Sequence, residues 1–463
     1  MKVHMIAACG VGMSALASLL REAGHEVTGS DEQAYPPAST LLESLGIRLG
    51  TGYDPARLDG ADVVVCGNAV RRTNPEAVAA RERNMRVVSF PQALEELFLA
   101  ARRPAVVAGT HGKTTSASML AYVLERTGRA PGYLIGGAPR DLKSAAALGR
   151  GEWFVIEGDE YDSAYFDKEP KFLHYHPALL VLTAVEFDHA DIYRDVDHVK
   201  SAFRKLLDGL EPGVPVIACT DFPHVRDLID GRPGALRRFG LDDPAEWRVS
   251  DLVDDGTTAF VVRERARKVV DVRLQVPGAI NARNALGVLL AAREIGLGWE
   301  EAAAALAEFR GVRRRQEVVG ETKGVTVIDD FAHHPTAVAE TLRALRLRYP
   351  GRRLRAVFEP RSNTSRRRVF QREYCDALSL ADESVLARVF TKDSDPIPVE
   401  ERLDPDLIAS DVSARGTPCR TIDGVDTIRD YLVASVRSGD VIVIMSNGAF
   451  GGLPRSLATA LGA

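Results

Sequence analysis

The segment from Ala105 to Thr115, with the sequence A-V-V-A-G-T-H-G-K-T-T, constrains the fold of this chain most strongly. Its apolar start is typical of a buried strand, and Gly109 and Gly112 follow in a short loop before Lys113. Glycines let backbone N–H groups face phosphate oxygens, and the N-terminus of the next helix adds partial positive charge. The segment therefore predicts a phosphate-binding loop between a strand and a helix of an α/β protein.

The loop also predicts individual nucleotide contacts. Lys113 can reach the terminal phosphates, and the hydroxyl of Thr114 can hold magnesium. The loop is shorter than the common G-x-x-x-x-G-K-[ST], because Val106 and Val107 stand where the first glycine would be. The alternative is a glycine turn before a helix with an exposed lysine. The predicted nucleotide-binding residues are Gly109, Thr110, His111, Gly112, Lys113, Thr114 and Thr115.

The 463 residues suggest about three domains. A net charge of -5 gives no nucleic-acid footprint, and no apolar run reaches membrane-spanning length. Five scattered cysteines without C-x-x-C indicate neither a disulfide framework nor a zinc site, so we expect a cytoplasmic protein. We expect strand, turn and helix rather than a signal peptide in residues 2–20, because Gly10 and Gly12 interrupt the apolar run.

Residues 1–102 are predicted to form a first α/β domain. A strand, Met1 to Ala8, leads to a G-x-G-x-x-A turn at Gly10 and Gly12 and a helix from Ser14 to Ala23. A second strand, Glu26 to Gly29, ends in Ser30 and Asp31, where such a fingerprint places an acidic residue for a ribose. Asn68 follows a further strand, Asp62 to Cys66.

Residues 103–314 are predicted to form the domain around the phosphate loop. A strand from Trp153 to Ile156 ends in Glu157, and one from Leu179 to Thr183 ends near Asp188 and His189. The carboxyl ends of parallel strands meet at one rim, so these groups should lie near Lys113. A carboxylate and an imidazole there suit a magnesium site, with Thr114, Glu157 and His189 as candidate ligands. An antiparallel meander over residues 248–276 and a helix within residues 278–293 should follow.

Residues 315–463 are predicted to form a third α/β domain in which four strands each run into a polar loop. The strands are Val325 to Ile328, Arg355 to Phe358, Ser384 to Phe390 and Val441 to Met445. The loops that follow them are Asp329 to Pro335, Glu359 to Thr364, Thr391 to Asp393 and Ser446 to Gly452. Polar loops at strand ends usually line a site.

With these motifs, the chain resembles the Mur ligase family, which joins amino acids or peptides to cell-wall precursors. The matching segments are G-T-H-G-K-T-T, E-G-D-E-Y-D, E-F-D-H-A-D, a G-x-x-N-x-x-N segment at Gly278, and R-R before the third domain. The resemblance covers the whole length. It implies a three-domain architecture: a Rossmann-like N-terminal domain, a P-loop-type central ATPase domain and a Rossmann-like C-terminal domain.

Within the family, the chain is most similar to members that join L-alanyl-γ-D-glutamyl-meso-diaminopimelate to UDP-N-acetylmuramate in peptidoglycan recycling. The segments that carry this similarity are Tyr35 to Glu43, Asp329 to Thr336, Glu359 to Thr364 and Met445 to Gly452. The resemblance implies ATP and Mg²⁺ as cofactors and an acyl-phosphate intermediate. The alternative within the family is ligation of L-alanine to UDP-N-acetylmuramate.

The resemblance also implies roles for residues of this chain. Lys113, Glu157 and His189 would take part in catalysis, and His333 or His334 could assist the attacking amine or orient substrate. Nucleotide contacts would come from Asn281, Asn284, Arg315 and Asp329, the last two after the third domain closes over the second. The candidate contacts to UDP-N-acetylmuramate are Gly10, Gly12, Ser30, Asp31 and Asn68. From the chemistry of the residues themselves, the candidate contacts to the murein peptide are Arg361, Ser362, Asn363 and Asn447, with Arg361 on a carboxylate. The alternative is that Arg361 braces its own loop through an internal ion pair.

The chain departs from the family pattern at two places. Ile280 stands where G-x-H-N carries histidine, and Lys205 does not fall in register with the carbamylated lysine of some members, so we assign it no role. Two other classes remain as alternatives: a nucleotide-gated binding protein without ligation, and a dehydrogenase that would rest on the first glycine turn alone.

Overall fold

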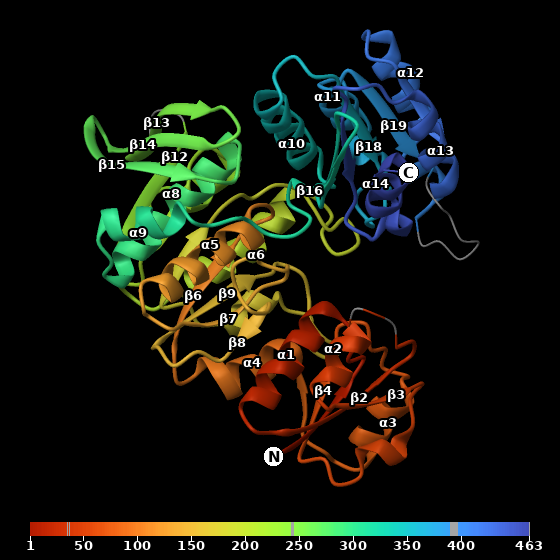
Figure 1. Ribbon diagram of the computed structural model, residues 1–463. Coiled ribbons are helices and arrows are strands. Elements are labelled where there is room, and N and C mark those ends of the chain that lie inside the picture. The colour runs from red at the N-terminus through yellow and green to blue at the C-terminus, as the bar shows by residue number, and fades with distance from the viewer. Residues whose placement is uncertain (35, 37, 242–244, 389–396, 463) are drawn as a thin grey trace.

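Three sheets, each with flanking helices, follow one another along the chain (Figure 1). The structure is a computed structural model that describes residues 1–34, 36, 38–241, 245–388 and 397–462. We call the parts around the three sheets the N-terminal, central and C-terminal units. Tyr35 and Pro37 of the segment Tyr35 to Glu43, and the predicted loop Thr391 to Asp393, lie outside the described residues.

The N-terminal unit is built on a five-stranded parallel sheet of order β3-β2-β1-β4-β5. Buried Val63, Val64 and Val65 of β4 form the kind of continuous apolar run that a sheet covered on both faces requires. Its strands and helices are β1 (Lys2–Ile6), α1 (Val11–Glu22), β2 (Glu26–Asp31), α2 (Ala38–Ser44), β3 (Arg48–Thr51), β4 (Val63–Cys66), α3 (Pro75–Glu82), β5 (Val87–Ser89) and α4 (Phe90–Leu94).

The central unit is built on a ten-stranded sheet of order β15-β14-β13-β12-β11-β10-β6-β9-β7-β8. Strands β13 to β15 form the predicted antiparallel meander at one edge. Its elements are β6 (Arg103–Ala108), α5 (Lys113–Arg126), β7 (Gly132–Leu134), β8 (Ala146–Ala147), β9 (Trp153–Gly158), β10 (Leu179–Leu182), α6 (Val196–Asp208), β11 (Val216–Cys219), α7 (Pro223–Ile229), β12 (Leu236–Gly240), β13 (Trp247–Asp254), β14 (Thr258–Glu264), β15 (Arg267–Leu274), α8 (Ala279–Ile295) and α9 (Trp299–Leu306).

The C-terminal unit is built on a six-stranded sheet of order β16-β17-β21-β18-β19-β20, parallel except for β16. Its elements are β16 (Glu317–Thr322), β17 (Val325–Asp330), α10 (Pro335–Arg348), β18 (Leu354–Phe358), α11 (Gln371–Leu378), β19 (Glu383–Ala387), α12 (Pro405–Ala414), β20 (Cys419–Ile422), α13 (Val425–Ser435), β21 (Val441–Met445) and α14 (Leu453–Gly462).

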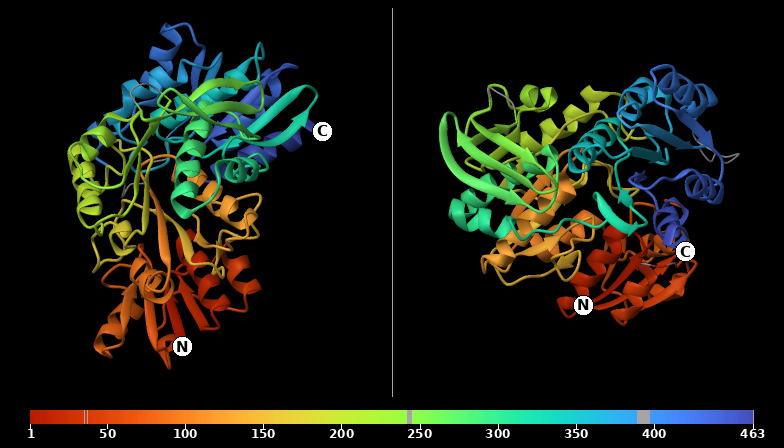
Figure 2. Two further views of the ribbon diagram at one scale, coloured as in Figure 1. Left: turned by 90° about the vertical axis from the view of Figure 1, so that its left-hand side faces the viewer. Right: turned by 45° about the horizontal axis from the view of Figure 1, so that its top comes forward.

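The units are arranged with the central one in contact with both others (Figures 1 and 2). One hydrophobic cluster runs through the N-terminal and central units, whereas the C-terminal unit has apolar clusters on the two faces of its own sheet. Among the residues that the structure describes, no helix is long and apolar enough to cross a membrane.

Several predicted boundaries are wrong by a few residues, and strand pairing explains three of them. Ser30, Glu157 and Asp329 were predicted in loops after strands but lie within strands, because neighbouring strands continue the ladder past them. The first helix begins at Val11 instead of Ser14, which places Gly12 inside the helix. The strand predicted over Ser384 to Phe390 ends at Ala387, and Phe390 lies outside the described residues.

Candidate active site at the junction of the central and C-terminal units

The phosphate loop joins β6 to α5 as the sequence predicts. Gly109 has a φ of +139° and Gly112 a φ of +83°, values that side chains with a Cβ rarely adopt. A Cβ on Gly109 would lie 2.7 Å from the carbonyl oxygen of Ala184, and one on Gly112 would lie 2.9 Å from Asn284 Oδ1. Glycine is therefore required both for the backbone conformation and for the close packing of the loop.

Lys113, the first residue of α5, forms a buried ion pair. Its Nζ donates to Glu160 Oε2 at 2.8 Å, and His189 Nε2 lies 3.1 Å from Glu160 Oε1. The Glu160 side chain has no exposed surface, and burial by itself raises its pKa, but Lys113 and His189 outweigh this and lower the pKa of Glu160 to about 2. Glu160, within the E-G-D-E segment, is a site residue that the sequence analysis missed.

The three candidate magnesium ligands are brought to this rim in two groups. Glu157 Oε2 accepts a hydrogen bond from Thr114 Oγ1 at 2.9 Å, and Oε1 accepts one from the N–H of Gly136 at 2.6 Å. Burial raises the pKa of the Glu157 carboxyl. His189 contacts Glu160 instead. Because Glu160 also pairs with Lys113, the residue before Thr114, the Lys113–Glu160 pair lies between the Thr114–Glu157 group and His189. Burial lowers the pKa of His189, but Glu160 and Asp188 outweigh it and raise that pKa to about 9.

The C-terminal unit docks on the segment that follows β10. Thr336 Oγ1, in the first turn of α10, donates to Glu186 Oε1 at 3.0 Å. The N–H of Ala190 donates to Thr364 Oγ1 at 3.0 Å. The polar segments that follow β17 and β18 therefore lie against the segment that follows β10.

His333 and His334 differ in their surroundings. His333 Nδ1 donates to the carbonyl of Phe331 at 3.0 Å, which leaves Nε2 facing Asp188 Oδ2 at 4.0 Å. His334 Nε2 donates to the carbonyl of Phe187, and its Nδ1 accepts from the N–H of Thr336. Burial lowers the pKa of both imidazoles, that of His334 to about 3, so both rings are neutral at pH 7.

His111, Glu186 and His334 form a cluster between the two units. Their candidate ligand atoms lie within 4.8 Å of one another, and His111 Nε2 is 3.0 Å from Glu186 Oε2. Because both nitrogens of His334 already have backbone partners, the cluster is an inter-unit contact rather than a prepared metal cage.

Arg314 and Arg315 interact with different acidic residues at the end of β17. Arg314 Nε lies 3.3 Å from Asp329 Oδ2, so Asp329 is engaged within its own unit. Burial lowers the pKa of Arg315, and the charges of Asp330 and Glu157 act against this effect. The charge of Arg315 therefore interacts with that of Glu157 in the central unit, whereas Asp329 pairs with Arg314.

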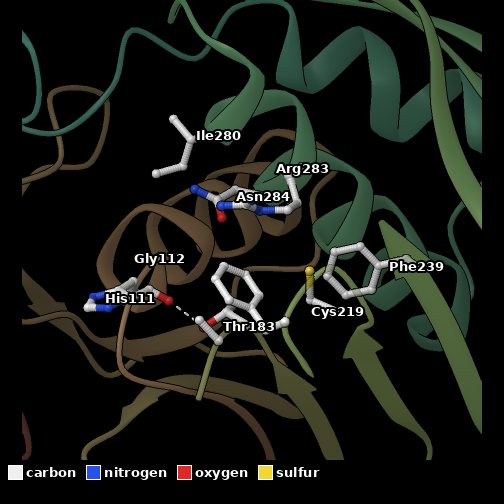
Figure 3. Close-up of a pocket in the computed structure, with 10 residues that line it drawn as sticks. His111, Gly112, Thr183, Cys219, Phe239, Ile280, Arg283 and Asn284 are labelled. Carbon is white, nitrogen blue, oxygen red and sulfur yellow. Dashed lines mark hydrogen bonds between the residues drawn. The ribbon is translucent and has the colours of Figure 1, made fainter. Parts of the chain in front are cut away.

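A small pocket opens beside the phosphate loop (Figure 3). It is lined by His111, Gly112, Thr183, Ala184, Cys219, Phe222, Phe239, Ile280, Arg283 and Asn284. The predicted contact Asn284 is one of these, whereas the side chain of Asn281 donates to the carbonyl of Pro277 at 2.6 Å. Ile280, the departure from the family pattern, adds an apolar side chain next to Arg283 and Asn284 of the same helix.

In the N-terminal unit, the two glycines of the first turn have different surroundings. A Cβ on Gly10 would meet nothing closer than Met13 at 3.9 Å, whereas one on Gly12 would lie 3.3 Å from the ring of Phe90. Gly12 therefore allows α1 to pack on α4. Gly10 and Asn68 are exposed to solvent, and we call the face on which Gly10 lies the open side.

Ser30 does not reach the open rim of the N-terminal sheet. Its side chain is fully buried and its hydroxyl donates to the buried carboxylate of Glu76. Asp31 Oδ2 accepts from the N–H of Cys9 at 2.8 Å and so holds the glycine turn in place. Of this predicted pair, Asp31 alone borders the turn.

Arg361 and Asn447 lie at adjacent strand ends of the C-terminal unit. Arg361 packs over Gly448, where a Cβ would overlap its side chain, and its Nη1 is 3.5 Å from Glu359 Oε1. The Arg361 side chain is 56% exposed. Asn447 Oδ1 is buried and has no hydrogen-bond partner among the described residues, which makes it available to a ligand.

Ser362, Asn363 and Lys205 are engaged elsewhere. The Ser362 hydroxyl accepts from the N–H of Ser365 at 2.9 Å and so shapes its own loop. Asn363 Nδ2 donates to Asp191 Oδ2 at 2.9 Å and joins the two units. Lys205 forms an exposed ion pair with Glu169 at 2.9 Å.

Comparisons with known proteins match all three parts of the chain. Residues 2–102 match "Mur ligase family, catalytic domain", residues 107–292 match "Mur ligase middle domain", and residues 314–448 match "Mur ligase, glutamate ligase domain". These matches follow the order of the three sheets.

Relatives and a solved structure match over nearly the whole length. The chain is 41% identical to the UDP-N-acetylmuramate–L-alanyl-gamma-D-glutamyl-meso-2,6-diaminoheptandioate ligase of Escherichia coli K12, over 99% of this chain and 97% of the relative. It is 37% identical to the UDP-N-acetylmuramate–L-alanine ligase of Symbiobacterium thermophilum, over 99% and 94%. The crystal structure of a murein peptide ligase from Psychrobacter arcticus superposes with a TM-score of 0.72 at 33% identity, over 100% and 99%. These comparisons confirm the predicted three-domain α/β architecture, and the chain belongs to the Mur ligase family.

Proposed function

We propose that this protein is an ATP-dependent, ADP-forming ligase that joins L-alanyl-γ-D-glutamyl-meso-diaminopimelate to UDP-N-acetylmuramate. The observation that carries the proposal is the convergence of the phosphate loop, the Glu157 and Glu160 carboxylates and the polar loops of the C-terminal unit at one rim. The 41% identity to the relative named for this tripeptide supports the choice of substrate.

We also propose a division of labour among domains 1–102, 103–314 and 315–463. The first would bind UDP-N-acetylmuramate on the open side of Gly10, the second ATP, and the third the peptide. The pocket beside Gly112 combines apolar side chains, among them Phe222 and Ile280, with the polar Asn284, a mixture that suits a nucleotide base. Asn447, with its buried unpartnered oxygen, and the exposed guanidinium of Arg361 are the proposed peptide contacts.

Thr114 and Glu157 are suited to hold Mg²⁺, because their oxygen atoms lie 2.9 Å apart and oxygen is the donor that this ion prefers. Bound there, the ion would offset the charge of the phosphates. Lys113 would leave Glu160 to bind phosphate oxygens, and Glu160 would keep His189 in place.

Ligation requires a neutral amine, because only its lone pair can attack the acyl phosphate formed from the muramate carboxylate and ATP. We assign the role of assisting base to His333: its ring is neutral, and its Nε2 lies 4.0 Å from Asp188, beyond hydrogen-bond distance. An imidazolium formed there is stabilised by that carboxylate. Replacement of His333 by Asn should lower kcat about 100-fold, whereas a kcat near that of the wild type would refute the assignment.

A phosphate-release assay tests the function as a whole. Phosphate should appear from ATP only when both UDP-N-acetylmuramate and the tripeptide are present, and the ligated product should be seen by mass spectrometry. A preference for free L-alanine would identify the alternative ligase of the same family. Nucleotide binding without any phosphate release would identify a gated binding protein instead.

A further inference from the structure

Helices α8 and α10 are in contact, and Arg283 of α8 pairs with a residue of α10. The same arginine is one of the side chains that line the pocket (Figure 3). Its Nη2 is 2.7 Å from Oε1 of Glu340 on α10, and its Nη1 is 3.6 Å from Oδ2 of Asp221, which follows β11. The Arg283 side chain is 11% exposed and that of Glu340 18% exposed. A largely buried cation is thus shared between the pocket wall and the C-terminal unit.

The backbone of α8 is shaped for this contact. Gly278, the residue before α8, has a φ of +104°, and a Cβ there would lie 2.8 Å from the Cβ of Ala344 on α10. On the pocket side, both carboxylate oxygens of Asp221 accept from the N–H of Leu241, at 3.0 and 3.1 Å. The two carboxylates that face Arg283 are therefore held on opposite sides, one in each unit.

Arg283 also forms part of the pocket surface. Its guanidinium carbon lies 4.8 Å from the centre of the Phe222 ring, and both residues line the pocket. Glu340 stands behind Arg283, outside the set of described residues that line the pocket. A ligand in the pocket therefore lies against Arg283 and makes no direct contact with Glu340.

We propose that Arg283 is a positioning residue that couples filling of this pocket to docking of the C-terminal unit. The proposal rests on the proposed function, because a nucleotide base is the ligand expected to fill the pocket. A planar base would exclude water from the open face of the guanidinium and stack on it. Charges attract more strongly when water is removed, so the base strengthens the Arg283–Glu340 pair and favours the docked unit. By linkage, the docked unit increases affinity for the base by the same factor.

Calorimetry on the full-length protein tests the coupling with three probes: ADP, adenosine and inorganic tripolyphosphate. Glu340→Gln should weaken binding of ADP and adenosine about fivefold and leave tripolyphosphate binding unchanged, since only the base touches Arg283. Arg343→Gln, which removes a charge from an exposed position of the same helix, is the matched control and should bind all three as the wild type does. Equal ADP affinity of Glu340→Gln and the wild type would overturn the proposal.

A double-mutant cycle separates coupling from a structural defect. Arg283→Met combined with Glu340→Gln should bind ADP no more weakly than Arg283→Met alone, because the second change has no partner left to lose. Additive losses would refute the coupling. If Glu340→Gln melts well below the wild type, Glu340→Asp, which keeps the charge, provides the second variant and should retain most of the ADP affinity.

The docking itself can be measured with spin labels on introduced residues at Leu347 of α10 and Val253 of β13, both exposed. Adenosine should narrow the distance distribution between the labels in the wild type and leave it unchanged in Arg283→Met. The same response in both proteins would contradict the proposal. Absence of ADP binding to the wild type would instead refute the proposed function.

Discussion

The buried Lys113–Glu160 pair allows the catalytic and structural roles of the phosphate-loop lysine to be separated. Lys113→Met removes the cation and keeps a side chain of similar length. It leaves Glu160, which has no exposed surface, with His189 at 3.1 Å as its remaining cationic partner. In the double variant Lys113→Met/Glu160→Gln, the second change removes the Glu160 carboxylate charge that has lost its lysine partner. We therefore compare the wild type, Lys113→Met and the double variant.

The magnitude of the effect follows from the environment of Glu160. Its pKa is lowered from 4.5 to about 2, and a shift of that size corresponds to about 3 kcal/mol of stability at neutral pH. Breaking a buried pair by removal of one partner costs about 3–5 kcal/mol. Because His189 remains, we expect Lys113→Met to destabilise the central unit by about 3 kcal/mol, which is about 6–12 °C in Tm for a unit of this size.

Scanning calorimetry and the phosphate-release assay together test this reasoning. Lys113→Met should melt at lower temperature, the double variant should recover most of the loss, and neither should retain more than about 1% of wild-type activity, because both lack the phosphate-binding cation. A Lys113→Met protein as stable as the wild type would refute the energetic argument. Recovery of activity in the double variant would refute the assignment of Lys113 to phosphate.

Three further predictions concern the other units and the interface. Burial raises the pKa of Glu186, but the contact with His111 outweighs burial and lowers this pKa from 4.5 to about 2. The ionised Glu186 therefore stabilises the fold fully above pH 4.5, and this contribution is lost as the pH falls towards 2. In a plot of unfolding free energy against pH, Glu186→Gln should reduce the decrease between pH 4.5 and 2. Gly10→Val should weaken UDP-N-acetylmuramate binding in calorimetry without lowering Tm, whereas Gly12→Val should also lower Tm, because its Cβ would press on Phe90; the opposite pattern would reverse these assignments. Arg361→Lys should raise the KM for tripeptide about tenfold and leave the KM for ATP unchanged, since lysine keeps the charge but loses the planar fork; an unaltered tripeptide KM would exclude Arg361 from the peptide site.

Local sequence patterns were sufficient to predict the three α/β parts and most of their strands. The phosphate loop is the clearest case, because its conformation depends on the two glycines themselves. Gly109 and Gly112 have positive φ values that residues with a Cβ rarely adopt. The antiparallel meander over residues 248–276 was predicted equally well, since alternating apolar and polar residues indicate strands with one buried face. Strand ends were less well predicted, because whether a ladder continues past Ser30 or Glu157 depends on the neighbouring strand.

The phosphate loop, the order of the three units and the family could be predicted from residues close together in the chain. Only the tertiary structure decided which partners the polar side chains take. In the structure Lys113 pairs with Glu160, Ser30 with Glu76 and Arg283 with Glu340. These partners are 47, 46 and 57 residues apart in the chain, and the last pair joins two units. Such pairings depend on which strand ends and helices meet in space. A pattern read along the chain carries no information about those distances.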